Sequence, residues 1–304
     1  MTTTTQAYNL PSQLINGLFA IKPLAQFAKH QARKMMVKRA ESLGIPWQQQ
    51  VETFRQQNWD HRFQAVQNPQ LEYADYYLRS FHAYDRGNLC WEAAWEQEVA
   101  AKAVHAKLWE DLGADSDRRL RDNYRDTIKN TLSTPPQSIL DLACGVGLST
   151  FSLQNLYPQA NCTGLDLSPH FLTLADYNSE QRQLTINWKH AAAEATGFPD
   201  QSFDFVSASF LFHELPQKIT QQIFQEVRRI LRPSGHFALL DSNPESSVYK
   251  QMPPYVFTLL KSTEPYLDEY FTLDLEQALI DAGFYPPTVQ IVSSRHRSVI
   301  TQVK

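Results

Sequence analysis

Residues 136–304 alternate short apolar runs with amphipathic segments, and this alternation restricts the fold more than any other feature. We expect strands near residues 138–142, 161–166, 184–189, 203–209 and 236–241, helices near 148–157, 169–179, 217–231 and 273–282, and further strands near 287–293 and 297–303. Strands separated by helices of this length form a mostly parallel sheet with helices on both faces. The sequence therefore predicts an α/β fold with a doubly wound, seven-stranded, mostly parallel sheet.

The chain before Pro135 has a different pattern. Helices are expected there at residues 22–43, 46–57, 90–113 and 115–132, and few strand-like runs occur. The pair Pro135–Pro136 cannot continue a helix and marks a boundary. We therefore predict a helical N-terminal cap over residues 1–134 and a second domain over residues 135–304.

Composition excludes some classes of protein. The net charge of −4 over 304 residues provides no positive field for collecting phosphates, so a nucleic-acid partner is not expected. The three cysteines, Cys90, Cys144 and Cys162, form no CxxC pair, which fits a reducing compartment. No apolar run is long enough to span a membrane, and the first residues lack the pattern of a secretory signal. We expect a cytoplasmic protein.

The first predicted strand of the second domain runs into a glycine-bearing loop, "ILDLACGVGLST" at residues 139–150. Gly145 and Gly147 let backbone amides approach a ligand closely, and a helix starting near Leu148 would add its positive N-terminal end. Doubly wound sheets bind ligands at this edge of the strands. A GxG pair by itself often marks only a tight turn.

Two acids narrow the choice of ligand. Asp141 stands immediately before the loop, where it would repel a pyrophosphate and attract an amino group, and Thr150 breaks the dinucleotide pattern GxGxxG. Asp166 ends the next strand, where an acid can accept hydrogen bonds from two ribose hydroxyls. An amino acid beside a ribose describes S-adenosyl-L-methionine (SAM).

Four segments then follow one another in a familiar order: "ILDLACGVG", "GLDLSPHFLTLA", "AAAEATGFPDQSFDFVSASFLFHELP" and "EVRRILRPSGHFALLD". Together they resemble class I SAM-dependent methyltransferases, in the branch similar to the ubiquinone and menaquinone biosynthesis enzymes (methyltransferase type 11). The resemblance covers residues 136–304. It implies a Rossmann-like SAM methyltransferase fold, SAM as the cofactor and S-adenosyl-L-homocysteine as its product.

The resemblance also implies roles for individual residues. The methionine part would be held by Asp141 and the Ala143–Gly147 loop, the ribose by Asp166 and the adenine by Leu167, Ala193 and Glu194, with Phe210 near the sulfonium. Three positions depart from the family pattern. Ala143 replaces the first loop glycine, and Ala192 replaces an aspartate, which leaves adenine recognition to backbone groups or Glu194. Ser234 replaces a glycine before the fifth strand, where Gly235 remains to supply a positive φ.

Methyl transfer from a sulfonium requires mainly alignment and exclusion of water, with a general base for a hydroxyl, protonated amine or acidic carbon. His213, in "FLFHELP" after the fourth strand, is the best base candidate, and Glu214 could orient it or bind the substrate. The alternative is that His213 caps a loop and Glu214 is a solvated neighbour. Asp241 is a weaker candidate that could instead bind loop amides. Cys144 is expected to pack, and the histidine spacing predicts no metal.

Residues 243–271 are too long for a plain strand-to-helix connection and suggest a lid. Its apolar and aromatic side chains could line an acceptor pocket or pack the lid on the helical part: Val256, Phe257, Leu259, Leu260, Tyr266 and Tyr270. In the cap, we expect Tyr84, Asn88 and Trp91 near the substrate.

The predicted helix at residues 22–43 carries six lysines and arginines between Lys22 and Arg39, with no acid among them. Such a helix can lie on an anionic membrane, although a charge run is more often a solvated face. The leading hypothesis is a methyltransferase acting on a small apolar or aromatic acceptor. Two alternatives stay open: a SAM-binding protein that methylates nothing, and a module that recruits a membrane or a partner. The sequence indicates no oligomeric state.

Overall fold

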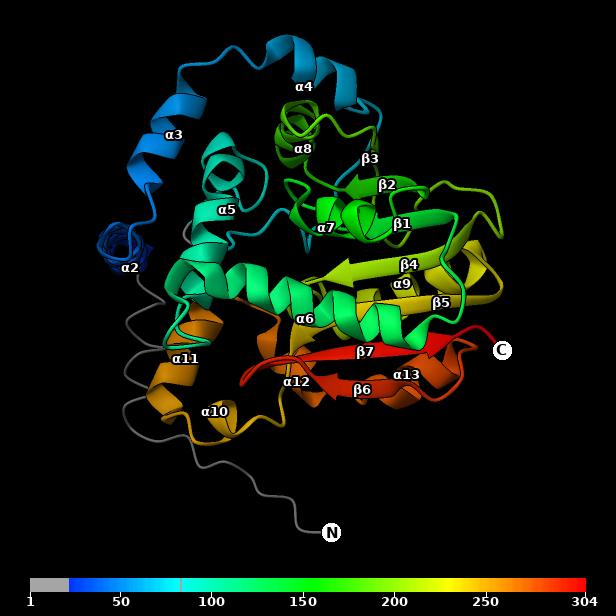
Figure 1. Ribbon diagram of the computed structural model, residues 1–304. Helices are drawn as coiled ribbons and strands as arrows, with labels where there is room; N and C mark the ends of the chain where they lie inside the picture. Colours follow the sequence, from blue (N-terminus) through cyan, green and yellow to red (C-terminus); the bar gives the residue numbers. More distant parts are fainter. Residues whose placement is uncertain (1–21, 83) are drawn as a thin grey trace.

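A seven-stranded sheet forms the centre of the computed structural model, which describes residues 22–82 and 84–304 (Figure 1). Its strand order is β3-β2-β1-β4-β5-β7-β6, and β7 runs antiparallel to its neighbours. The strands are β1 Ser138–Leu142, β2 Asn161–Asp166, β3 Asn187–His190, β4 Phe203–Ser209, β5 Leu231–Ser242, β6 Thr288–Ile291 and β7 His296–Gln302. The predicted α/β class is confirmed, with β3 starting three residues later than expected and β5 five residues earlier.

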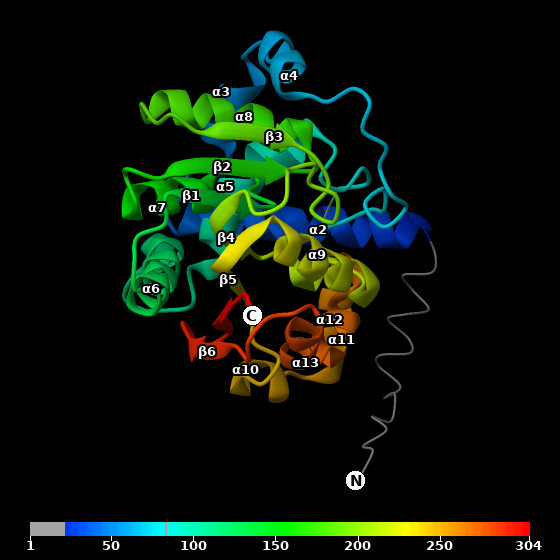
Figure 2. The same ribbon diagram turned by 90° about the vertical axis from the view of Figure 1, so that its right-hand side faces the viewer.

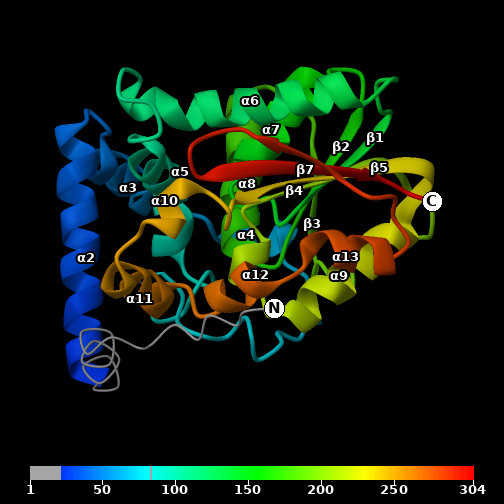
Figure 3. The ribbon, with the colours of Figure 1, turned by 90° about the horizontal axis from the view of Figure 1, so that it is seen from below.

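Helices cover both faces of this sheet (Figure 3). One face carries α6 (Ser116–Thr131) and α7 (Leu148–Leu156), and the other carries α9 (Gln217–Ile230) and α13 (Leu275–Asp281). Neighbouring residues of β1 show why: Ile139 belongs to the core under α6 and Leu140 to the core under α9. Because side chains alternate along a strand, an apolar run such as "SILDL" is buried on both sides.

Four N-terminal helices gather near the carboxyl ends of the parallel strands (Figures 1 and 2). They are α2 Lys22–Ser42, α3 Trp47–Arg55, α4 Asp60–Val66 and α5 Trp91–His105. Trp47, Trp59 and Trp95 form an apolar cluster with Phe171 of α8 (Pro169–Gln181), so the helices pack directly on the sheet domain. The predicted helix at 90–113 is too long: it ends at His105, and Leu108, beyond that end, is buried against α6.

The segment after β5 folds into short helices at the same edge of the sheet. These are α10 Ser247–Lys250, α11 Pro254–Thr263 and α12 Leu267–Thr272. The backbone amide of His82 donates a hydrogen bond to the carbonyl of Thr263 over 2.9 Å. The insertion is therefore tied to the loop that precedes α5.

Non-glycine residues take up left-handed backbone conformations at three turns of interest. Ala143 follows β1 with φ 55° and Phe210 follows β4 with φ 60°, a conformation that costs an L-residue roughly 1–2 kcal/mol. In the turn before the parallel part of β5, Ser234 itself has φ 63°. The expectation that Gly235 supplies the positive φ is wrong. Gly235 is needed for space, because a Cβ there would lie 2.9 Å from the carbonyl oxygen of Arg232.

Within residues 22–82 and 84–304, no helix combines the length and the apolar content that crossing a bilayer requires.

Candidate active site

Asp141 is the last residue but one of β1 and lacks a partner for one of its oxygens. Its Oδ2 accepts hydrogen bonds from the hydroxyls of Ser149 and Thr150, each over 2.6 Å, whereas Oδ1 is buried without a hydrogen bond. The side chain is 1% exposed, and burial raises its pKa to about 6. A cationic group beside Oδ1 would satisfy this oxygen and favour the charged carboxylate.

Asp166 ends β2 and is held by backbone amides. Its Oδ2 accepts from the amide of Gly145 over 2.8 Å and its Oδ1 from the amide of Ser168 over 2.7 Å. Burial raises its pKa to about 7, although the two amides act in the opposite direction. Each oxygen keeps a lone pair for one further donor, as the two hydroxyls of a ribose require.

The loop between β1 and α7 is contacted by the helical cap. Gly145 and Gly147 have φ values of 55° and 91°, and a Cβ on Gly145 would lie 2.4 Å from Oε1 of Gln97. That oxygen accepts a hydrogen bond from the amide of Val146 over 2.7 Å. Gln97 in α5 has no counterpart in the sequence predictions, because nothing in its local sequence marks a contact with a loop 49 residues away.

The segment 68–77 covers the carboxyl ends of β2 and β3. His190 accepts from the amide of Asn68 through Nδ1 over 2.9 Å, and its Nε2 lies 3.0 Å from the carbonyl of Leu167. The hydroxyl of Tyr76 donates to Oε1 of Glu194 over 2.7 Å, whereas Oε2 of Glu194 is buried without a partner. Leu167 and Ala193 are both buried. The residues expected around an adenine therefore share one neighbourhood.

A histidine–aspartate pair lies between the carboxyl ends of β4 and β5. Nδ1 of His213 is 2.6 Å from Oδ1 of Asp241, which is fully buried. Oδ2 of Asp241 accepts from the amide of Phe212 over 2.9 Å, so Asp241 both orients His213 and binds a loop amide. Burial lowers the pKa of His213, but the charge and hydrogen bond of Asp241 outweigh it and raise the value to about 10.

Glu214 does not orient His213, contrary to one expectation. Its Oε2 accepts from the side-chain amide of Asn88 over 3.5 Å, and its Oε1 lies 3.6 Å from Nε2 of His82. The partner of His213 is Asp241, which the sequence places 28 residues away.

Phe210 lies beside two further buried histidines. Its ring centroid is 5.3 Å from that of His105 and 5.5 Å from that of His296. His105 ends α5 and His296 begins β7, so only the antiparallel last strand brings His296 to this edge. Neither histidine is marked as a site residue by its local sequence.

Of the other residues predicted to line the pocket of the methyl acceptor, Tyr270 lies near His213 and Tyr266 packs elsewhere. Tyr270 is near the site: its ring centroid is 6.5 Å from that of His213, and its hydroxyl donates to the carbonyl of Ser242 over 2.8 Å. Tyr266, also in the insertion, is buried under the guanidinium of Arg79. The other predicted lining residues of the insertion include Leu259, whose side chain lies outside the described residues.

Tyr84 and Trp91 pack within the cap. The hydroxyl of Tyr84 donates to the buried carboxylate of Glu96 over 2.6 Å, and Trp91 stacks on Trp59 and Trp95. The structure does not bring these two residues together with His213. Asn88, by contrast, reaches this edge, since its carbonyl accepts from the hydroxyl of Ser168 over 2.7 Å.

Part of the charge on the basic helix α2 is used inside the protein. Arg33 donates to the fully buried Glu96, with 3.0 Å between Nε and Oε2. The side chains at 22–30 and at 32 lie outside the described residues, and so does most of the surface on which the membrane prediction depends.

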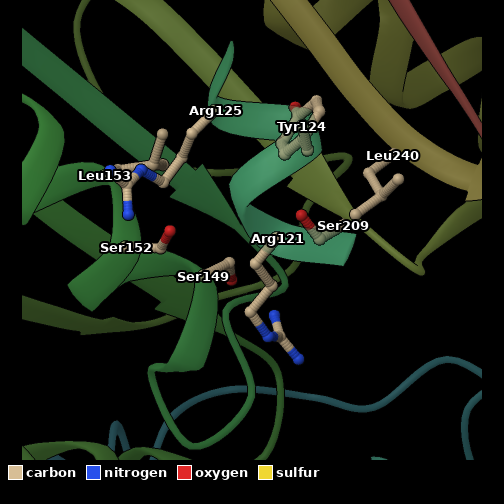
Figure 4. Close-up of a pocket in the computed structure, with 8 residues that line it drawn as sticks. All are labelled: Arg121, Tyr124, Arg125, Ser149, Ser152, Leu153, Ser209 and Leu240. Atoms are coloured by element: carbon tan, nitrogen blue, oxygen red, sulfur yellow. The ribbon is translucent and has the colours of Figure 1, made fainter. Parts of the chain in front are cut away.

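Two hollows lie outside the site, one near it and one far from it. One, of about 10 Å³, has room for about one water and lies between α6, α7 and the end of β4 (Figure 4). Ser149, Ser209 and Arg121 are among its lining residues. The other, of about 430 Å³, lies at the opposite edge of the sheet, where Arg232 already pairs with Asp204 over 2.6 Å. Among the described residues, no three metal-binding side chains lie together.

The geometry defines a class of protein: a doubly wound sheet with buried acids after β1 and β2, as in SAM-dependent methyltransferases. Comparisons agree. The family model described as "Methyltransferase domain" matches residues 139–235. Solved structures of a Pyrococcus horikoshii protein and an Aquifex aeolicus SAM-dependent methyltransferase share the fold, each with a TM-score of 0.50. Their sequence identities are 19% and 18%, covering 64% and 62% of this chain and 94% and 93% of theirs.

Sequence relatives identify the family. A Synechocystis protein named as an uncharacterized methyltransferase is 34% identical over 52% of this chain and 71% of its own length. Demethylmenaquinone methyltransferases of Lactococcus lactis and Thermus thermophilus are each 32% identical, over 46% and 40% of this chain. The chain spans about half the length of these two relatives, 55% and 54%. The protein belongs to the SAM-dependent methyltransferases, and it is an enzyme that uses SAM.

Proposed function

We propose that the enzyme methylates a hydroxyl or enol group of a small aromatic, quinone-like acceptor. The observation that carries this proposal is the buried pair of His213 and Asp241, 2.6 Å apart, with the ring of Tyr270 6.5 Å from that of His213. An aromatic surround favours a flat apolar acceptor, and an oriented imidazole favours one that reacts through an acidic oxygen or carbon.

The acidic residues at this edge fit SAM in charge. Oδ1 of Asp141 and Oε2 of Glu194 are buried acceptors without donors. We assign Asp141 to the ammonium group, Asp166 to the ribose hydroxyls and Glu194 to the adenine amino group. Glu194 would thereby replace the aspartate that Ala192 lacks. When bound, SAM supplies a methyl group attached to a positive sulfur.

Leu167 and Ala193 would cover the faces of the adenine, and Phe210 would exclude water from the reacting methyl group. The cap, from residue 22 on, and the insertion at 243–271 would together close this edge, since the amide of His82 is bonded to the carbonyl of Thr263. Both parts would therefore help to keep water from the reaction.

His213 would contact the reacting oxygen of the acceptor. Asp241 raises the pKa of His213 to about 10, so His213 carries a proton at neutral pH. A protonated imidazole stabilises an oxygen anion, and it does so strongly where water is excluded. The base role expected from the sequence would instead require the neutral ring, with Nδ1 donating to the Asp241 carboxylate and Nε2 bare.

The relatives support the acceptor class. The relatives from Lactococcus lactis and Thermus thermophilus carry the name demethylmenaquinone methyltransferase. For this chain we propose only the chemical class of the acceptor, a compound with a quinone-like ring. A lipid-linked acceptor would suit peripheral membrane contact through residues 22–43. This contact stays a prediction, as does a cytoplasmic location.

The first test is a thermal-shift panel with SAM, S-adenosylhomocysteine, NAD and buffer, followed by a methyl-transfer assay with quinols and other hydroxylated aromatics. A ligand at a hundred times its dissociation constant stabilises a protein by about 2.7 kcal/mol. We expect shifts with SAM and S-adenosylhomocysteine but not NAD, and transfer to at least one aromatic hydroxyl. SAM binding without transfer to any such acceptor would contradict the proposed acceptor class.

A further inference from the structure

His105 is a buried histidine at the acceptor side that the mechanism above does not use. It stands at the end of α5, and its ring lies 5.3 Å from the rings of both Phe210 and His296. Phe210 in turn holds its position through a hydrogen bond from its amide to the carbonyl of Leu240, over 2.8 Å. His105 thus contacts the side chain that is expected nearest to the reacting methyl group.

A carboxylate orients His105 in the same way as Asp241 orients His213. Nδ1 of His105 lies 2.7 Å from Oδ1 of Asp117, and Arg121 donates to Oδ2 of Asp117 over 3.0 Å. Since a carboxylate accepts, Nδ1 carries the proton. No described residue forms a hydrogen bond with Nε2, so the lone pair of the neutral ring is free.

The surroundings of His105 favour the neutral ring. Burial lowers its pKa, and although Asp117 acts in the opposite direction, the charges of Arg121 and Arg295 lower it further. His296, the remaining titratable neighbour, is itself kept neutral by burial, which lowers its pKa to about 2. His105 is therefore surrounded by one acid and two arginines.

The surroundings of His213 have the opposite effect. Burial is outweighed by the charges of Asp241, Glu264 and Glu214, all of which raise its pKa, and His296 is its neutral neighbour. Two histidines at one edge are thus pushed toward different protonation states. Such pairs mark the acid and base assignments in known active sites.

We propose that His105, held by Asp117, is a second catalytic residue, which takes the proton released by a weakly acidic aromatic hydroxyl while His213 holds the oxygen. This inference rests on the proposed function. The acceptor oxygen forms a bond to the methyl carbon, and the carbon–sulfur bond breaks with its electron pair remaining on sulfur. The hydroxyl proton passes to Nε2 of His105 and then to water.

The test uses two aromatic acceptors of similar shape, one with a hydroxyl pKa of about 10 and one already ionised at the assay pH. His105→Gln should lower kcat about 10²-fold for the first acceptor, the usual contribution of a general base, and leave the second nearly unchanged. SAM affinity, measured by calorimetry, should stay the same. His236→Gln is the matched control, because His236 starts the parallel part of β5 at the opposite edge of the sheet, and it should alter neither rate.

Equal losses of kcat for the two acceptors, or no loss for either, would overturn the inference while leaving the proposed function intact. Transfer to neither acceptor by the unaltered enzyme would overturn the proposed function and this inference with it.

A second measurement needs no variant and covers the case in which His105→Gln fails to fold. Nitrogen NMR of histidine-labelled enzyme should show that the ring of His105 is neutral at neutral pH, with Nδ1 protonated and Nε2 bare. Sequential assignment through Val104 distinguishes this ring from that of His296, which also contacts Phe210. A protonated Nε2 on the ring of His105 would overturn the inference.

Discussion

The two halves of the sheet's carboxyl edge use buried acids in opposite ways. After β1 and β2, Asp141 and Asp166 accept only hydroxyl and amide donors, and one oxygen of Asp141 has no partner. After β5, Asp241 is paired with the imidazole of His213. The acids of the first half lack a cationic partner, which a bound ligand would have to supply. The acid of the second half, Asp241, already has its partner in His213. Ligand binding should therefore change the first half most.

Removing the ribose acid should have the largest effect. Asp166→Ala is expected to weaken SAM binding about 10²-fold or more and to abolish transfer, because hydrogen bonds to a charged acceptor contribute roughly 1.5–3 kcal/mol each. Calorimetry measures the affinity directly. Asp200→Ala, at a surface acid paired with Arg229, is the control and should bind SAM normally. Normal SAM affinity and transfer in Asp166→Ala would return Asp166 to a structural role.

Removing the imidazole of the second half should separate turnover from cofactor binding. His213→Ala is expected to lower kcat by about 10²-fold, the scale of a lost donor to an oxygen anion, with SAM affinity unchanged. Steady-state kinetics with a hydroxylated aromatic acceptor measures this. Near-normal turnover would eliminate His213 from the mechanism.

Removing the charge of the partner of His213 should change the pH dependence of the methyl-transfer rate. Asp241→Asn removes the charge that raises the pKa of His213, so the pKa should fall and the alkaline limb of the rate profile should move toward neutral pH. A profile unchanged in position would show that His213 does not titrate in the reaction.

Cofactor affinity should depend on pH through the first half alone. The pKa values of Asp141 and Asp166 are raised to about 6 and about 7, and SAM needs both carboxylates charged. SAM affinity should therefore fall as pH decreases below 7, by about tenfold per pH unit for each protonated acid. Calorimetry between pH 5 and 8 checks this, and Asp241→Asn should leave the curve unchanged.

The smallest effect is expected at Ala143. Its φ of 55° is strained for alanine and free for glycine, so Ala143→Gly should stabilise the folded enzyme by up to about 1 kcal/mol after the entropy of the unfolded chain is counted. Thermal unfolding measures this. A destabilised variant would mean that the methyl group of Ala143 makes a packing contribution larger than the strain.

Prediction from sequence succeeded where the signal was local. Strand β1, which contains Asp141, and helix α7 lie within twenty residues, and their periodicity alone predicted both elements. It failed where the chain returned from far away. Helix α5 was expected to continue to residue 113 because its composition is helical, yet it ends at His105, whose side chain is bonded to Asp117.

The sequence by itself determined the fold class, the order of strands and helices, and the acids at the carboxyl ends of β1 and β2, because each depends on periodicity or on a residue at a strand end. Only the tertiary structure decided the partners. Asp241 reaches His213 because β4 and β5 are neighbours, and His105 and His296 meet at Phe210 because β7 runs antiparallel and α5 crosses the edge. Hydrogen bonds and ring contacts depend on distances of a few ångströms, which strand pairing creates between residues far apart in the chain.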